Sequence, residues 1–420
     1  MKTLMDKYYS GGTVYEDFKK VIINTDNITK NFRTNIDSIH LLSICTLPEY
    51  KKEGYQAFYI FTKENVESIL AGGKFKIGHV PVEKIGEELL NECRATTGLM
   101  AIIGDEKYIV SELAFNTLMM RAGVSGDMTV IRNNMIRDLH IADALQHRSD
   151  YTTIVYREVE GIKKIFAFMG RQYGYIPQSS ITDMADNIIS DGVLGEVECM
   201  GWTVSQDFTN LVLKFPEAAE EFKDVYGVDI TPGVLFCTSD TGDSAVTARG
   251  IYLSGHSYVI TEEIKKNHTT GLNINDLIKE VDEEIFKKIR KFPELLMSLI
   301  GEYVTDYSSI DLTTMSGQQK NSLIVGDMIE KIFKSFKMKD LAAKKKKEII
   351  NAMKQEINPA IPYTKYDLAM LFIDLPDRIS GINDRYLLDD IRKNCGKVPQ
   401  FIKDKLSTKI EDDSEIFLTM

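Results

Sequence analysis

The chain has 420 residues, of which 43% are hydrophobic and 27% are charged, as in water-soluble globular proteins with more than one core. Its formal net charge of -11 excludes an evenly basic surface of the kind that coats nucleic acid, but it does not exclude a local basic face. The five cysteines contain no Cys-x-x-Cys pair, the first residues carry no apolar run, and no segment is apolar over the length of a membrane span. We therefore expect reduced thiols, no cysteine zinc site, no signal peptide and a cytoplasmic protein that does not enter a membrane.

Residues 1–95 are predicted to form an N-terminal segment of mixed helices and strands. Residues 36–46 and 56–62 are rich in β-branched and aromatic side chains, which favours strands. Residues 82–93 repeat their apolar side chains at the spacing of a helix. We expect this segment to flank a larger core.

Residues 96–271 are predicted to form that core, an antiparallel sheet with helices beside it. Ser111 stands where a helix N-cap belongs, and Gly123 stands where the same helix should stop. Glu160 and Gly161 separate two β-rich runs, which is typical of a hairpin. Later runs alternate apolar and polar side chains, as half-buried antiparallel strands do.

Residues 272–420 are predicted to form a helical C-terminal lobe. Asn275 is the expected cap of its first helix, and residues 322–336 and 339–357 carry apolar side chains at helical spacing. The predicted fold class is therefore α+β: an antiparallel sheet with flanking helices, followed by a helical C-terminal lobe.

Residues 239–244 hold the densest group of polar side chains, in a turn between two β-rich runs. Asp240 and Asp243 could bind a metal ion, with His256 or His268 completing the site. The alternative is a turn whose side chains bond their own backbone, and we favour it because the spacing matches no defined metal loop. No cofactor is predicted.

A group of lysines in the C-terminal lobe could form a basic face for phosphates or an acidic partner. Arg171 and Tyr173 could add a basic and aromatic patch for single strands. The alternative is a solvated helix face whose charge is offset by nearby acids, and for charge runs this is the favoured interpretation. The lysines are Lys334, Lys337, Lys344, Lys345, Lys346 and Lys347.

Three segments of the chain follow one another in the order found in a known protein family. They are Tyr-Ile-Val-Ser at residues 108–111 before a helix, residues 165–173 ending in Arg-Gln-Tyr, and the strand and turn of residues 232–242. Together they resemble a phage- and plasmid-encoded family, the domain-of-unknown-function 932 family. The chain departs from the family at Thr238 and Asp240, where the family has Asn and Glu. The resemblance implies an α+β core, a phage or prophage origin and a place in the host cytoplasm. It implies no catalytic residue, because the family has no established activity.

These observations predict a non-enzymatic, phage-type binding protein that acts on single-stranded nucleic acid or on replication and recombination partners through its basic helical lobe. Two alternatives are a virion-assembly protein that self-associates into a homo-oligomer and a counter-defence protein that binds a host factor. A third is a metal-dependent hydrolase that uses Asp240, Asp243 and His268.

Overall fold

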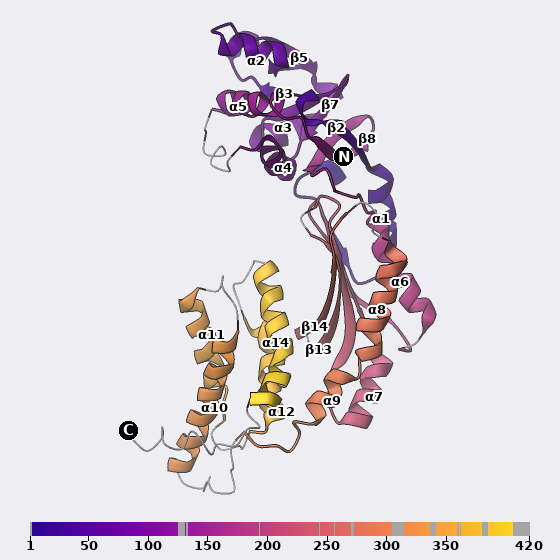
Figure 1. The fold of residues 1–420 in the computed structure, drawn as a ribbon, viewed down its shortest axis with the longest axis vertical. Helices are drawn as coiled ribbons and strands as arrows, with labels where there is room; N and C mark the ends of the chain where they lie inside the picture. The colour runs from indigo at the N-terminus through magenta and orange to yellow at the C-terminus, as the bar shows by residue number, and fades with distance from the viewer. Residues whose placement is uncertain are drawn as a thin grey trace.

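The computed structural model of the protein describes residues 2–124, 131, 133–192, 194–242, 244–255, 257–269, 273–304, 315–336, 342–358, 361, 363–379 and 385–405. The molecule is elongated and contains two sheets (Figure 1). One sheet lies in an upper lobe, which consists of residues 29–169. The other, the lower sheet, has helices on both sides. The predicted α+β class, with a helical C-terminal region, is confirmed.

The upper lobe is built on an eight-stranded sheet in the order β2-β8-β9-β7-β6-β3-β4-β5. Neighbouring strands are antiparallel except β7 and β9, which are parallel. Helices α2, α4 and α5 share a core with one face of the sheet, and α3 shares a core with the other. The strands are β2 (Thr29–Asn35), β3 (Ile39–Ile44), β4 (Tyr55–Phe61), β5 (Ile77–Pro81), β6 (Leu99–Ile103), β7 (Glu106–Val110), β8 (Tyr151–Val159) and β9 (Ile162–Met169). The helices are α2 (Lys63–Leu70), α3 (Glu87–Ala95), α4 (Glu112–Ala122) and α5 (Asn134–Gln146).

The lower sheet has six antiparallel strands in the order β1-β10-β11-β12-β13-β14. Helices α1, α6, α7, α8 and α9 cover one of its faces, on the right in Figure 1. The strands are β1 (Tyr9–Gly12), β10 (Glu198–Ser205), β11 (Thr209–Lys214), β12 (Thr231–Thr238), β13 (Val246–Ser254) and β14 (Ser257–Lys266). The helices are α1 (Tyr15–Ile28), α6 (Ser179–Asp191), α7 (Pro216–Tyr226), α8 (Ile274–Glu284) and α9 (Lys291–Met297).

The remaining described helices form a helical lobe on the left in Figure 1. They are α10 (Met315–Ser335), α11 (Ala343–Gln355), α12 (Lys365–Ile373), α13 (Leu375–Arg378) and α14 (Arg385–Lys405). Their apolar side chains belong to the same hydrophobic core as those of α1, α6, α7, α8 and α9. Among the described residues, no helix combines the length and the apolar composition that a membrane crossing needs.

The strand pairing places the boundaries between the structural units of the chain at other residues than the sequence predicted. The expected boundary after residue 95 runs through the upper sheet, because β3 and β4 come before it and β6 comes after it. The upper lobe is inserted between α1 and α6, both of which pack on the lower sheet. Likewise α8 and α9 follow residue 271 but pack on that sheet rather than with the helical lobe alone.

The helix ends predicted from local sequence are confirmed in part. Ser111 accepts a hydrogen bond from the backbone N–H of Ala114, and Gly123 ends the helix with a left-handed conformation, as predicted. The predicted cap Asn275 is wrong by two residues. Asn273 is the cap, and its side chain accepts from the N–H of Asn275. Two asparagines in one turn offer the same chemistry, so the sequence did not decide between them.

Candidate functional site

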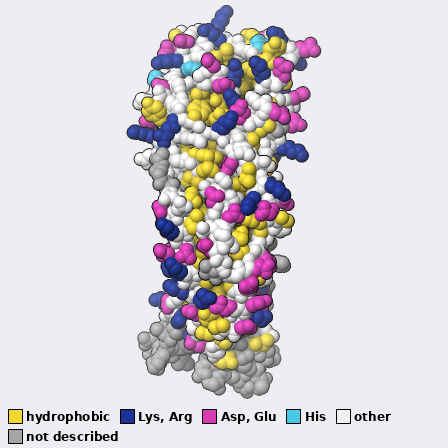
Figure 2. All heavy atoms as spheres, turned by 90° about the vertical axis from the view of Figure 1, so that its right-hand side faces the viewer, with side chains coloured by type: hydrophobic (Ala, Val, Ile, Leu, Met, Phe, Trp, Pro, Cys, Tyr) yellow, Lys and Arg dark blue, Asp and Glu magenta, His cyan; other side chains and the backbone are white. Residues whose placement is uncertain are grey.

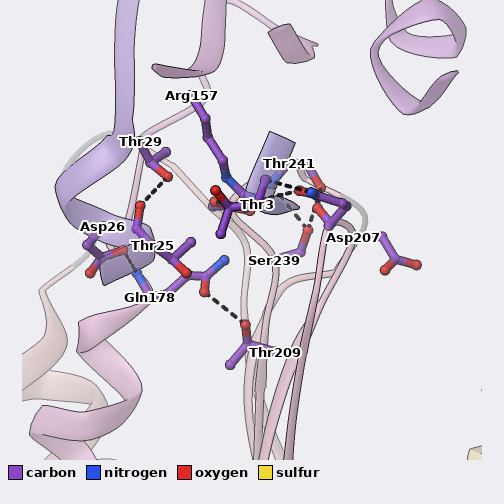
Figure 3. Close-up of polar contacts among 12 residues, drawn as sticks. Thr3, Thr25, Asp26, Thr29, Arg157, Gln178, Asp207, Thr209, Ser239 and Thr241 are labelled. Atoms are coloured by element: carbon purple, nitrogen blue, oxygen red, sulfur yellow. Dashed lines mark hydrogen bonds and ion pairs between the residues drawn. The ribbon is translucent and has the colours of Figure 1, made fainter. Parts of the chain in front are cut away.

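A buried ion pair lies where the upper lobe meets the lower sheet. Arg157 of β8 donates from Nη2 to Asp240 Oδ2 at 2.9 Å, and each side chain is 1% exposed. A second guanidinium nitrogen of Arg157, the side chain labelled in Figure 3, donates to Gln206 Oε1. Gln206 follows β10. Gln206 in turn donates to the backbone oxygens of Thr3 and Met5, at 2.8 and 2.6 Å. Five groups from four parts of the chain therefore meet at one junction between the lobes.

Tyr173 and His268 complete this junction as buried side chains. The Tyr173 hydroxyl donates to the backbone oxygen of Asp240 at 2.8 Å, and its ring stacks on His268 with the centroids 5.4 Å apart. Tyr173 is only 7% exposed. Its ring face is already occupied, so it is not open to a nucleic-acid base as the sequence had suggested.

The turn after β12 is held by its own side chains. Ser239 Oγ lies 3.0 Å from Thr241 Oγ1 and accepts from the N–H of Thr241 at 3.3 Å. These are the local bonds that the structural interpretation of the turn predicted. Gly242 has a φ of 80°, and a Cβ atom there would overlap the end of Met169, so the turn requires glycine.

The predicted metal site receives no ligand set from the described residues. One oxygen of Asp240 is taken by Arg157, a cation that already balances its charge, while the other has no partner among the described residues. Within the same residues, no three His, Cys, Asp or Glu side chains lie together as metal ligands. Asp243 and His256 lie outside them, so a metal site at Asp240, Asp243 and His268 stays a prediction.

The predicted nucleic-acid residues are spread over distant parts of the fold. Lys334 is exposed near the end of α10, and Lys344 to Lys347 occupy the start of α11, where the helix dipole disfavours cations. Arg171 is exposed beyond the end of β9, and Lys337 lies outside the described residues. On the side of the molecule that carries α6, α7 and α8, basic and acidic side chains are mixed without a single-sign field (Figure 2).

A groove of about 570 Å³ lies between the uncovered part of the lower sheet and the start of α14. Its floor is formed by β1 and by β10 to β13, with Gly11, Gly201 and Arg249 among the residues that line it. Its wall is formed by Arg385, Tyr386, Asp389 and Arg392 of α14. This groove was not predicted from the sequence.

The groove exists because α14 lies against only one edge of the lower sheet, at β14. A Cβ atom at Gly396 would overlap the carbonyl oxygen of Ile260 in β14, so the helix lies directly on that strand. One turn earlier, the guanidinium of Arg392 lies 3.8 Å from the ring centroid of Tyr258. The helix therefore covers β14 and leaves β10 and β11 open.

The groove is positively biased. The described residues that line it include Arg249, Arg385 and Arg392 but only one acid, Asp389. Arg249 donates to Asp389 at 2.6 Å and to Glu263 at 2.8 Å, outside the groove. Burial alone would raise the pKa of Glu263, but a hydrogen bond from Lys393 and the charge of Arg249 lower it below its usual value. Glu263 therefore stays ionised near neutral pH, and its ion pair and that of Asp389 hold Arg249 at the floor of the groove.

Aromatic side chains stand at the mouth of the groove. Tyr9 is 65% exposed and Tyr386 is 55% exposed. The guanidinium of Arg385 lies 3.9 Å from the ring centroid of Phe208, and it donates to the Tyr386 hydroxyl at 3.0 Å. Trp202 also lines the groove, and its indole N–H donates to the backbone oxygen of Val14 at 3.0 Å. Arginines fixed beside exposed rings suit a ligand with both negative charge and planar groups.

Comparison with known proteins adds no further residue to this site. No family model, curated protein or solved structure matches the chain. The resemblance to the phage and plasmid family is therefore still an expectation.

Replacing His268 with phenylalanine is expected to remove part of the acid sensitivity of the fold. Burial lowers the pKa of His268 to about 4, whereas the unfolded chain protonates it near 6.5. The unfolded state thus binds the extra proton as the pH falls from 6.5 to about 4, which costs the folded state on the order of 3 kcal/mol. Above pH 6.5 this cost is absent and the fold keeps its full stability; the cost grows as the pH falls toward 4. Phenylalanine keeps the stacking on Tyr173 but does not titrate.

The measurement is urea unfolding of both proteins at pH 7 and near pH 4. The difference in unfolding free energy between them should change by about 3 kcal/mol in favour of the variant as the pH falls. Burial raises the pKa of Asp138 to about 6, but that group is the same in both proteins and cancels. A constant difference across this range would mean that His268 is solvated.

Proposed function

We propose that the protein binds single-stranded nucleic acid in the groove between the lower sheet and α14. The observation that carries the proposal is the arginine and aromatic lining of this groove, in a chain whose net charge is -11. Single-strand binding needs cations that follow the phosphates and ring faces on which bases stack. Arg385 and Arg392 supply the first, and Tyr9 and Tyr386 supply the second. The phage setting rests on the family resemblance.

This proposal moves the predicted binding face. The sequence placed it on the lysines of α10 and α11 together with Arg171 and Tyr173, but Tyr173 is buried. The groove supports the same ligand chemistry with rings that are exposed. A small residue in its floor favours a flexible single strand, because a ligand backbone can approach Gly201 closely.

The test is the affinity of the full chain for a labelled oligodeoxythymidine across a series of salt concentrations. For single strands, the logarithm of the association constant falls with the logarithm of salt by about 0.7 for each phosphate neutralised. Arg385→Gln should therefore reduce the slope by about 0.7. Tyr386→Leu should weaken binding about 10-fold, because stacking on one ring is lost.

Lys397→Gln is the matched control, since Lys397 is an exposed cation on the same helix that does not line the groove. Its binding and its salt slope should equal those of the unchanged protein. The single tryptophan gives a second signal, because Trp202 lines the groove and its emission should change on binding. The proposal would be overturned if binding were lost when all four lysines of residues 344–347 are replaced with glutamine, while the groove variants still bound normally. A lack of binding at low salt would also overturn it.

A further inference from the structure

A second hollow, of about 1080 Å³, lies in the upper lobe, away from the groove. Aromatic side chains form one of its walls. Phe75 packs edge-on against Tyr59, with ring centroids 5.7 Å apart, and against Phe61, at 6.4 Å. Tyr50 is 38% exposed, and its carbonyl oxygen is 2.9 Å from His79 Nε2. These two edge-on contacts fix the orientation of the Phe75 ring before any ligand arrives.

The charged side chains that line the hollow are basic. Lys74 and Arg94 line it, and none of the described lining residues is acidic. Arg94 is held by neutral amides: it donates to Gln56 Oε1 at 2.6 and 3.1 Å and to Asn91 Oδ1 at 2.8 Å. These partners fix the guanidinium but do not neutralise it, so its full charge is available to an anion.

Two asparagines lie at the start of α5, on the rim of the same hollow. Asn133 Oδ1 accepts from the N–H of Met135 at 3.1 Å and so caps the helix. Asn134 lies beside Gly98, whose φ of 65° and missing side chain make room for its amide, because a Cβ atom there would be 2.9 Å from Nδ2. Side-chain amides can donate to and accept from the edge of a nucleobase at once.

We propose that this hollow binds a nucleotide, with its base on the Phe75 and Tyr50 side and its phosphate on Arg94 and Lys74. Rings, amides and unneutralised cations within one hollow match the three parts of such a ligand. The volume of about 1080 Å³ slightly exceeds the usual range for small-molecule sites, so a nucleotide would fit with room to spare. The proposal does not rest on the groove beside α14, because the two sites share no residue.

The test is calorimetric titration of the full chain with AMP, GMP, CMP and UMP, and separately with adenosine and inorganic phosphate. At least one nucleotide should bind more tightly than either fragment. Arg94→Gln and Phe75→Leu should each weaken that binding about 10-fold, through loss of the charge-assisted bond and of the ring face. Lys76→Gln is the matched control, because Lys76 is an exposed cation two residues from Lys74 that does not line the hollow.

Thermal unfolding of each variant checks that it is folded. A competition experiment in the Arg385→Gln protein distinguishes two natural ligands, the end of a strand and a free nucleotide. If a 5′-phosphorylated oligonucleotide displaces the bound nucleotide, the hollow accepts the end of a strand. Either ligand supports the site. Saturable binding that is equal in all variants, or the absence of saturable binding by all four nucleotides, would overturn the proposal.

Discussion

Replacing Arg157 with methionine is expected to lower the free energy of unfolding by about 3 to 5 kcal/mol. The substitution leaves Asp240, which is 1% exposed, as a buried charge without its cation. It also removes the donor that Gln206 accepts from. Methionine fills most of the volume, so the loss is electrostatic rather than a cavity. Urea unfolding at neutral pH measures the effect.

The double substitution Arg157→Met and Asp240→Leu is the control for this interpretation. Removing both partners leaves no buried charge, so much of the lost stability should return. If the double variant were less stable than Arg157→Met by the full cost of Asp240→Leu alone, the two residues would not interact. A cost below about 1 kcal/mol for Arg157→Met would place the pair among solvated surface pairs and contradict its burial.

Features that depend on neighbouring residues were predictable from the sequence. The turn at Glu160 and Gly161 is an example, because both residues take a positive φ, 52° and 78°, in the hairpin between β8 and β9. A glycine after a polar residue between two β-rich runs favours such a turn wherever the hairpin lies in the fold. The cap at Ser111 is local in the same way.

Features that depend on distant partners were not predictable. Arg157 lies in a strand of alternating side chains, and its acidic partner is 83 residues further along the chain. Nothing near either residue shows that both are buried. Similarly, β1 pairs with β10, and β7 lies parallel to β9, so the sheets contain neighbours that the chain order does not indicate. The boundary expected after residue 95 falls inside the upper sheet in the same way, because β3 pairs with β6.

The groove was partly accessible to sequence reasoning. Arg385, Asp389 and Arg392 have the spacing of one helix face, and this pattern could have marked α14 as a charged wall. The floor of the groove could not be recognised, because a strand that contains Gly11 or Gly201 does not reveal which of its faces is left uncovered. That depends on Gly396, which lets α14 lie on β14 and stop short of β11.

Lys163 and Lys164 offer a second test of large expected effect, since they are adjacent in β9 and point to opposite faces. Lys164 is 1% exposed and pairs with Asp6 at 2.9 Å and Glu92 at 2.6 Å. Lys163 is 17% exposed and pairs with the exposed Glu106. Lys164→Met should therefore cost about 3 to 5 kcal/mol, because two half-enclosed carboxylates lose their cation. Lys163→Met should cost no more than about 1 kcal/mol.

Urea unfolding of the two variants under one set of conditions makes the comparison. A further variant, Lys164→Met with Glu92→Gln, should regain part of the loss, because only one carboxylate then lacks a partner. Asp6 belongs to the N-terminal segment that also accepts from Gln206 at the junction, so Lys164 ties that segment to the upper lobe. Equal costs for the two lysines would mean that Asp6 and Glu92 are solvated and that the segment is not held there. A larger cost for Lys164 would show that the lysine on the buried face of β9, and not its neighbour on the other face, holds the N-terminal segment against the upper lobe.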